Sequence, residues 1–213
     1  MDHHRDWYWE QRVARVIANL EKHNMAGFYV QDEVQLLAKV EELIPEGSVV
    51  AVGDSLTLFE TGVIGLLRGG RYRFLDKHRE GLTSAVKREI YLASFSADTF
   101  LCSTNALTEA GELYNVDGNG SRVAALLYGP EQVIVVAGRN KIVADLDEAR
   151  QRVRRYAAPL DAKRLGKRTP CASLGHCLDC DSPERICNDY VVIKRQFIKG
   201  RIKVIIVGKD LGY

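Results

Sequence analysis

The sequence predicts an α/β protein built on a mostly parallel sheet with helices on both faces. Short apolar, β-branched segments alternate along the chain with segments of helical periodicity, which is the pattern of repeated βα units. Residues 133–137 (VIVVA) are apolar at every position, as in a strand buried on both faces of a parallel sheet. With 213 residues, 46% of them hydrophobic, the chain is expected to form one domain over residues 1–213.

The first quarter of the chain alternates helix, strand, helix and strand. Residues 5–24 carry apolar side chains at the i, i+3, i+4 spacing of an amphipathic helix. Phe28–Val30 is predicted to be a short strand, and Asp32 can cap a second helix. Proline and glycine then separate this helix from a buried strand at Ser48–Val52. The apolar face of the second helix is expected to consist of Val34, Leu37, Val40, Leu43 and Ile44.

The remaining elements continue the alternation. A glycine turn after Val52 leads into a helix that extends through Leu67. Strands are predicted at Tyr72–Leu75, Thr99–Ser103 and 133–137, and helices at Leu82–Phe95, 121–128 and Asp145–Tyr156. Pro159 is expected to interrupt the last of these helices. Near the end, Tyr190–Phe197 and Ile202–Val207 predict a hairpin or strand pair around Lys199-Gly200.

The turn Gly53-Asp-Ser-Leu-Thr57 is a candidate anion-binding site. It leaves a predicted strand and enters a predicted helix, with Ser55 or Thr57 at the cap position. Backbone N–H groups at such a helix start are free to bind an anion. Ordinary helix capping explains the same residues equally well, so both interpretations stay open.

Lys141 is the sharpest catalytic candidate. It follows the strand at 133–137 within the tetrad Gly-Arg-Asn-Lys, and in open α/β sheets ligands bind outside the carboxyl ends of the strands. A lysine there can hold a carboxylate or phosphate, or act as a base if it is desolvated; the alternative is a surface lysine. Asn140 lies beside it. Glu109 is the second candidate, as acid, base or nucleophile, although it could also be an ordinary helix or turn glutamate.

The polar segment 115–120 (NVDGNG) superficially begins a calcium-binding loop. Position twelve of such a loop requires a bidentate glutamate, and Leu126 occupies it here, so calcium is excluded. The segment is either a tight turn rich in Asn, Asp and Gly, or a substrate loop at the start of the helix at 121–128. The complete set of ligand-binding candidates is Gly53, Ser55, Thr57, Asn105, Asn115, Asp117, Asn119, Arg122 and Asn140.

Four of the five cysteines form a C-x5-C-x2-C-x6-C pattern within the loop 169–188: Cys171, Cys177, Cys180 and Cys187. Four soft ligands in a reducing compartment suit a zinc ion or an iron–sulfur cluster. The spacing matches neither a zinc ribbon nor a bacterial ferredoxin, so the metal stays undecided, and His176 could replace one thiolate. A redox or disulfide pair and unliganded thiols are the alternatives. The fifth cysteine, Cys102, is expected to pack in the core.

The net charge and the hydropathy of the chain limit the kinds of partner and the cellular location that are expected. The formal net charge is +2, so neither nucleic acid nor an anionic membrane is expected to bind. No apolar segment approaches the ~20 residues that span a bilayer, and the first residues lack the apolar region of a signal peptide. A cytoplasmic protein with reduced thiols is therefore expected. Residues 163–203 are basic, which indicates either a solvated surface or a docking region for an acidic partner.

The chain resembles the lactate-utilisation (LUD) family, in particular its small single-domain proteins of the LutC or YkgG type. The likeness covers nearly the whole length, and its motifs are VGDSLTLFETG at 52–62, STNALTEAGELYNVDGNGSRVAALLYGP at 103–130, VIVVAGRNKIV at 133–143 and TPCASLGHCLDCDSPERICN at 169–188. The resemblance implies a fold similar to the NagB/RpiA/CoA-transferase group. In that group the glycine-serine turn after the first core strand binds phosphate, CoA or carboxylate groups.

The resemblance also implies a role in oxidising L-lactate to pyruvate, together with separate iron–sulfur subunits that carry electrons. This chain lacks the multiple ferredoxin-like cysteine runs of the larger family subunit, so it is not expected to be the electron conduit by itself. Its expected ligand is a small carboxylate or phosphorylated molecule, and it could also form a homo-oligomer. The alternatives are a free-standing enzyme of the isomerase, CoA-transferase or cyclo-ligase kind, and a non-catalytic regulatory or scaffold protein.

Overall fold

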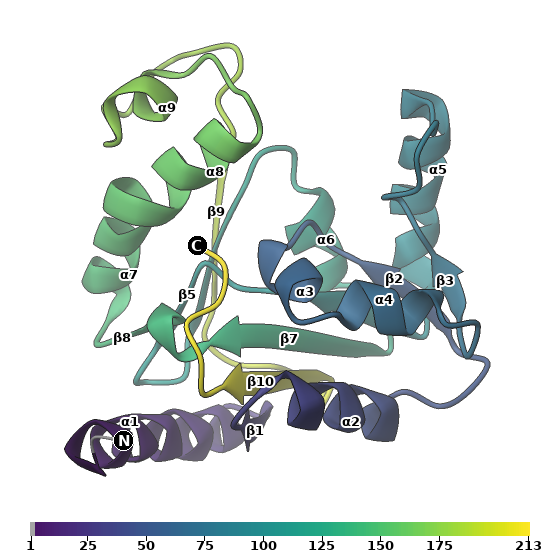
Figure 1. Ribbon diagram of the computed structural model, residues 1–213, viewed down its shortest axis with the longest axis vertical. Helices are drawn as coiled ribbons and strands as arrows, with labels where there is room; N and C mark the ends of the chain where they lie inside the picture. Colours follow the sequence, from purple (N-terminus) through teal and green to yellow (C-terminus); the bar gives the residue numbers. More distant parts are fainter. Residues whose placement is uncertain (1–2) are drawn as a thin grey trace.

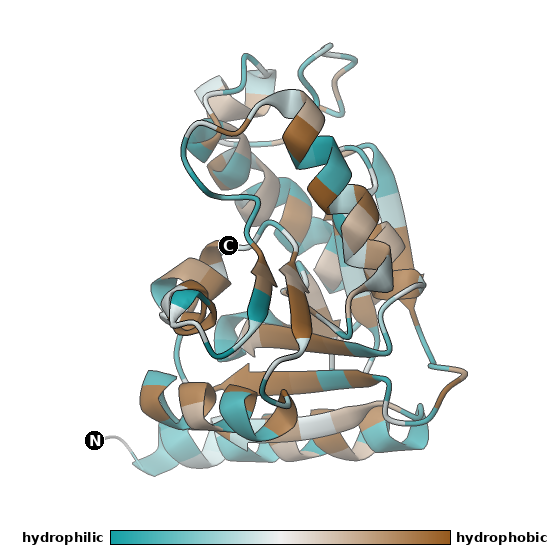
Figure 2. Ribbon diagram, turned by 90° about the vertical axis from the view of Figure 1, so that its right-hand side faces the viewer, coloured by the Kyte–Doolittle hydropathy of each residue, from teal (hydrophilic) through white to brown (hydrophobic). Residues whose placement is uncertain are grey.

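The computed structural model describes residues 3–213, and its main sheet contains six strands, all of them parallel, in the order β1-β10-β7-β4-β2-β3 (Figure 1). These strands are β1 (Ala26–Val30), β2 (Val49–Val52), β3 (Arg73–Leu75), β4 (Thr99–Cys102), β7 (Gln132–Gly138) and β10 (Ile202–Val207). The central strands are mostly apolar, with brown predominating along them in Figure 2, because helices cover both of their faces. The predicted α/β class with a mostly parallel sheet is confirmed.

Helices cover the two faces of this sheet with separate apolar cores. On one face, α1 (His3–Lys22) and α6 (Ser121–Leu127) contribute side chains such as Val16 and Leu126. On the other face, α2 (Glu33–Leu43), α3 (Leu56–Glu60) and α4 (Val63–Arg68) form the second core. Gly62, in the left-handed conformation, separates α3 from α4, so the single helix predicted through Leu67 is two short ones. A further helix, α5 (Ser84–Ala93), buries none of its residues.

The buried face of α2 includes four of the five predicted residues: Val40 and Ile44 are buried, and Leu37 and Leu43 pack against the same core. Asp32 caps the helix as expected, accepting a hydrogen bond from the Gln35 backbone N–H at 2.9 Å. However, Leu36, Val40 and Ile44 are fully buried, whereas Val34 is 77% exposed. Residues four apart lie on one line of a helix, and two residues correspond to about 200° of rotation, so burial of Leu36 turns Val34 towards solvent.

A second sheet was not predicted. Within residues 3–213 it has four strands in the order β8-β5-β6-β9, namely β8 (Ile142–Val143), β5 (Ala106–Thr108), β6 (Leu113–Asp117) and β9 (Asp189–Ile193). One of its faces packs into the core beneath α1 through Leu107, Leu113 and Ile193. Its other face, including Ala106 and Tyr114, packs against α7 (Leu146–Arg152). The sheet therefore joins the main domain to the C-terminal helices.

The predicted pairing of the last two strands is wrong, although both strands form. β9 pairs antiparallel with β6, and β10 lies between β1 and β7 in the main sheet. The physical reason is burial. β10 is apolar at five of its six positions (IKVIIV), so it is stable at the centre of a sheet, whereas Tyr190 and Val192 of β9 are partly exposed on an edge strand.

Pro159 does not interrupt the helix that begins at Leu146. The chain continues from α7 through a π-helical turn, Val153–Ala157, into α8 (Ala158–Arg164). Pro159 lies in the first turn of α8, and the wider π-helical hydrogen-bond pattern before it removes the need for an N–H at that position. A short helix, α9 (Pro170–Leu174), then leads into the cysteine loop. No helix among residues 3–213 combines the length and the apolar character needed for a bilayer crossing.

Candidate functional site

A cleft of about 730 Å³ lies where the strands β2 and β4 end. Its walls come from the loops after these strands, from the segment between β6 and α6, from α8 and from the cysteine loop. This is the position at which open parallel sheets bind ligands. Its size suits a small molecule. The sequence-predicted residues among those that line it are Ser55, Thr57, Asn105, Asp117, Asn119, Arg122 and Lys141.

Lys141 lies at the floor of this cleft. It ends the 3₁₀ turn Arg139–Lys141 that follows β7, and only 4% of the residue is exposed. Its Nζ donates hydrogen bonds to Ser103 Oγ at 2.9 Å and to Thr57 Oγ1 at 3.2 Å. Burial, together with the nearby cations Arg152 and Arg122, lowers the pKa of Lys141 to about 7. The amine can therefore be either a cation or a base at neutral pH.

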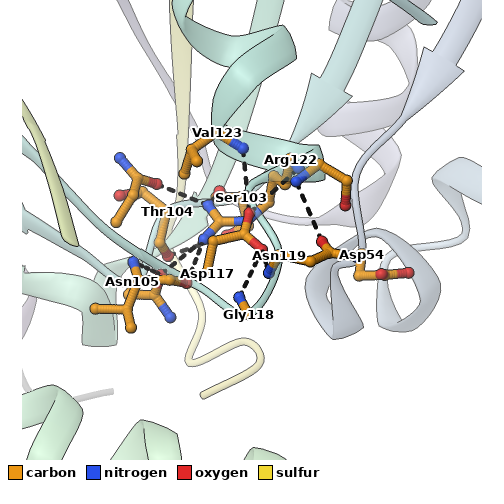
Figure 3. A network of polar contacts seen from close by, with 12 residues as sticks. Asp54, Ser103, Thr104, Asn105, Asp117, Gly118, Asn119, Arg122 and Val123 are labelled. Carbon is orange, nitrogen blue, oxygen red and sulfur yellow. Dashed lines mark hydrogen bonds and ion pairs between the residues drawn. The ribbon is translucent and has the colours of Figure 1, made fainter. Parts of the chain in front are cut away.

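Arg122 organises the back wall of the cleft (Figure 3). Its guanidinium donates to Asn115 Oδ1 at 2.7 Å and to Asn105 Oδ1 at 3.0 Å, and also to the carbonyl oxygens of Ser103 and Val116. These four acceptors bind the two terminal nitrogens of the buried guanidinium, and its Nε lies 3.8 Å from Asp117 Oδ2. Asn105 and Asn115, predicted to bind ligand, therefore hold Arg122.

Asp117 caps the helix α6. Its Oδ2 accepts from the backbone N–H groups of Arg122 (3.2 Å) and Val123 (3.1 Å), and its Oδ1 accepts from Gly118 (2.7 Å), contacts drawn in Figure 3. Gly120, the residue that precedes the helix, has no side chain to do this. Asn119 Oδ1 accepts from the Ser121 N–H at 3.2 Å. The polar segment 115–120 is therefore a strand end and a capping turn.

The glycine turn after β2 has two structural functions. Ser55 caps α3 by accepting from the Leu58 N–H at 3.3 Å, and Thr57 is a partner of Lys141. A Cβ at Gly53 would lie 2.8 Å from Arg122 Cγ and 3.1 Å from Cys102 Cβ. Gly53 thus allows the Arg122 side chain to lie against β2, and it does not itself line the cleft.

A cluster of charged residues after β2 and β3 was missed in the sequence. Lys77 Nζ lies 3.1 Å from Asp54 Oδ1, and His78 Nε2 lies 3.9 Å from the same oxygen. Burial lowers the pKa of Lys77 and of His78, and although burial alone would raise the pKa of Asp54, Lys77 and His78 hold it below its usual range. Within residues 3–213 His78 Nε2 has no hydrogen-bond partner, and both Asp54 and His78 line the cleft. The signal for them was the polar sequence Asp-Lys-His directly after a predicted strand.

Besides Gly53 and Asn115, two further predicted residues, Glu109 and Asn140, do not line the cleft. Glu109 pairs with Arg12 at 2.7 Å and with Arg15 at 3.1 Å, both on α1. Asn140 holds the segment 211–212, accepting from the Leu211 N–H at 3.1 Å and donating to the carbonyl oxygens of Leu211 and Gly212. The predicted catalytic pair Glu109 and Lys141 is therefore not brought together, because Glu109 belongs to the packing of α1 on the second sheet.

The structure does bring the four loop cysteines together. Cys171, Cys177, Cys180 and Cys187 line one small cavity, whose walls also include Arg185 and Ile186. Arg185 and Ile186 line the cleft as well. Within residues 3–213, the side chains as positioned in the structure place no group of three His, Cys, Asp or Glu residues around a common metal position. His176 is exposed and does not line the cavity. Cys102 packs in the core as predicted, and burial raises its pKa to about 11.

Comparisons with known proteins agree with the fold. A family model described as the LUD domain matches residues 13–207. The crystal structure of a DUF162 family protein from Deinococcus radiodurans matches with a TM-score of 0.55 and 15% identity, covering 94% of this chain and 98% of that chain. The structure of eIF2B beta from Chaetomium thermophilum matches with a TM-score of only 0.37 and 15% identity over 55% of this chain and 44% of that one. No curated protein matches in sequence.

Proposed function

Because the chain belongs to the LUD domain family, which is associated with lactate utilisation, we propose that it takes part in the oxidation of L-lactate to pyruvate in the cytoplasm. In this proposal the cleft binds a small carboxylate or phosphorylated ligand. Oxidation of lactate releases two electrons, and iron–sulfur subunits of the same complex are the proposed carriers of these electrons. One observation supports anion binding above all: the buried amine of Lys141 at the floor of the cleft.

The argument from Lys141 is electrostatic. A protonated lysine has three N–H donors, and the hydroxyl groups of Ser103 and Thr57 accept two of them. No carboxylate forms an ion pair with Lys141 within residues 3–213. A buried cation without a counterion is unstable, and an anionic ligand in the cleft would supply one. Arg122 adds positive potential, but its two terminal nitrogens already donate to protein acceptors.

Binding of a small anion to the purified chain tests the proposal. Calorimetric titration with L-lactate, pyruvate and inorganic phosphate is expected to detect at least one ligand. Lys141→Met removes the charge at similar volume and should weaken that binding at least tenfold. Lys39→Met, on α2 outside the cleft, is the matched control and should bind like the wild type. Equal affinity in Lys141→Met, or no binding of any of the three anions, would contradict the assigned site.

The cellular part of the proposal needs a separate experiment. A strain without this protein should not grow on L-lactate, and the tagged protein should co-purify with iron–sulfur subunits. Re-expression of the wild-type chain should restore growth, whereas the Lys141→Met chain should not. Normal growth of the deletion strain, with no co-purifying partner, would count against a role in lactate utilisation.

A free-standing enzyme of the isomerase, CoA-transferase or cyclo-ligase kind is the second candidate. It is favoured by the pKa of Lys141 of about 7, since a half-neutral amine in a cleft is suited to general-base catalysis. Turnover of a sugar phosphate or CoA ester by the isolated chain, lost in Lys141→Ala, would support it. Glu109→Gln should retain that turnover, because Glu109 pairs with α1 outside the cleft.

A further inference from the structure

The cavity between α8 and the cysteine loop has the composition of a metal site. It has room for about one ion-sized sphere, about 10 Å³, and four thiols from three parts of the chain line it. Cys171 comes from α9, Cys177 and Cys180 from the loop after it, and Cys187 from just before β9. All four thiols are free and partly buried, whereas Cys102 is fully buried elsewhere.

The loop is held by separate polar contacts, such as those of Arg168 with Glu184 and of Asn188 with the Gly118 carbonyl, and not by a regular backbone ladder. Residues 175–188 contain no helix or strand, and Leu178 is 54% exposed. Ordering a backbone costs roughly 1–2 kcal/mol per residue, which is normally offset by apolar burial or regular hydrogen bonding. Small segments without a core of their own are typically held by disulfides or by a structural metal. These four cysteines form no disulfide in the structure, so a structural metal is the stabilising device that their side chains can supply.

Hydrogen-bond donors surround these sulfurs as they do around metal-bound thiolates. The Asp179 N–H donates to Cys177 Sγ at 3.3 Å, with Asp179 in the left-handed conformation (φ 54°), and Thr169 Oγ1 lies 3.2 Å from Cys171 Sγ. Such donors stabilise negative charge on sulfur, and it is the thiolate that binds metal.

We propose that Cys171, Cys177, Cys180 and Cys187 bind one tetrahedral metal ion, with Zn²⁺ as the expected ion. Zinc prefers four thiolates in closed structural sites. Each cysteine has one side-chain torsion to turn its sulfur towards the shared centre. No thiol is left over for a substrate, so the site is structural.

Metal binding here also fixes part of the cleft wall. Arg185 donates to the carbonyl oxygens of Cys180 (2.6 Å) and Cys187 (3.0 Å), so its position follows the conformation of the ligand-bearing loop. Arg185 and Ile186 line both the cysteine cavity and the cleft. The metal is therefore inferred to hold one wall of the cleft in place.

Metal analysis of protein purified under reducing, anaerobic conditions tests the site directly and independently of any ligand. Elemental analysis should find one zinc per chain, and the cobalt-substituted protein should show thiolate-to-cobalt charge-transfer absorption. The variants Cys177→Ser and Cys180→Ser should retain less than a tenth of the metal. Cys102→Ala and His176→Ala are the matched controls and should retain all of it.

Native protein offers a second measurement, in case the serine variants fail to fold. Titrating the zinc-loaded chain with a mercurial thiol reagent should release one zinc as four thiols react. Tryptic cleavage within residues 175–188 should be slow with zinc and at least tenfold faster after chelation. Metal-free wild-type protein, full metal content in both serine variants, disulfides between these cysteines, or iron with acid-labile sulfide would each overturn the assignment of a single ion.

Discussion

The pKa of Lys141 is set by the surroundings of its side chain. An exposed lysine has a pKa near 10.5, and burial lowers the pKa of this one to about 7. Between these two pH values the unfolded chain holds a proton on Lys141 that the folded chain has lost. The free energy of unfolding must therefore rise with pH in this window, and the destabilisation is complete below about pH 7.

The Lys141→Met variant makes this contribution measurable. Urea unfolding at pH 7, 8 and 9 should show a free energy of unfolding that rises more steeply with pH in the wild type than in the variant, by up to about 1.4 kcal/mol per pH unit. Lys77 and the other titrating groups are common to both proteins and cancel in the difference. Parallel pH profiles would mean that Lys141 keeps an ordinary pKa.

Gly53 has to lack a side chain because Arg122 lies against it. In Gly53→Ala, the new methyl group would be 2.8 Å from Arg122 Cγ, and the bound guanidinium cannot move away without losing its acceptors. The expected loss is about 1–3 kcal/mol of unfolding free energy, measured by urea denaturation.

Gly65→Ala is the control for that substitution. Gly65 lies in α4, and no atom comes within 4 Å of the place that an alanine methyl group would take, so alanine should be neutral or stabilise by up to about 1 kcal/mol. Equal effects at the two glycines would show that contact with Arg122 does not matter.

For individual residues, the sequence was sufficient to identify some members of the cleft and insufficient to identify others. Lys141 was identifiable because it follows an apolar strand, and strand ends are where parallel sheets bind ligands. The contact of Asn105 and Asn115 with Arg122 was not identifiable from the sequence, because it depends on the pairing of β5 with β6. Asp54 and His78 were missed because each lies in a predicted turn, where a polar residue is common and does not indicate a site.

Among the elements, α6 depends on a cap located three residues before its own N-cap position. Asp117→Ala would remove the acceptor for the N–H groups of Arg122 and Val123, and also the carboxylate 3.8 Å from the Arg122 guanidinium. A loss of about 1–2 kcal/mol of unfolding free energy is expected from the cap alone.

Asp117→Asn separates the two effects, because the amide oxygen can still accept a hydrogen bond while the charge is gone. Its stability in urea should lie between that of the wild type and that of Asp117→Ala. If Asp117→Ala were as stable as the wild type, the Asn-Asp-Gly segment would be free to serve a ligand after all.

The elements that sequence periodicity identified are the long or uniformly apolar ones. β2 and β7 were recognised because helices cover both of their faces, and α1 because its apolar stripe is long. β5 has only three residues, and β6 contains Asn115 and Asp117, so neither shows a strand pattern. The partners of β9 and β10 depend on contacts far apart in sequence, which local pattern does not encode.

At the scale of the molecule, the two sheets share one core and should unfold together. Leu113 of the second sheet is fully buried in the same cluster as Val133 and Val204 of the main sheet. Leu113→Ala should lower the free energy of unfolding by about 2–5 kcal/mol. Circular dichroism and tryptophan fluorescence should still report one transition, since the cluster crosses both sheets.

Leu127→Ala is the matched control, because Leu127 is 50% exposed, and its truncation should cost well under 1 kcal/mol. Two separate transitions in Leu113→Ala, with only one of them shifted, would show that the second sheet is an independent unit.

The position of β10 has a consequence for how the chain folds during its synthesis. β10 pairs with β1 on one side and with β7 on the other, so β1 has no strand to join until residue 207 has left the ribosome. Sheets built on such distant pairings form slowly, and unpaired strand edges invite association between nascent chains. β1 therefore stays without a strand partner, although α1 can already pack on it, until residues 202–207 have been synthesised.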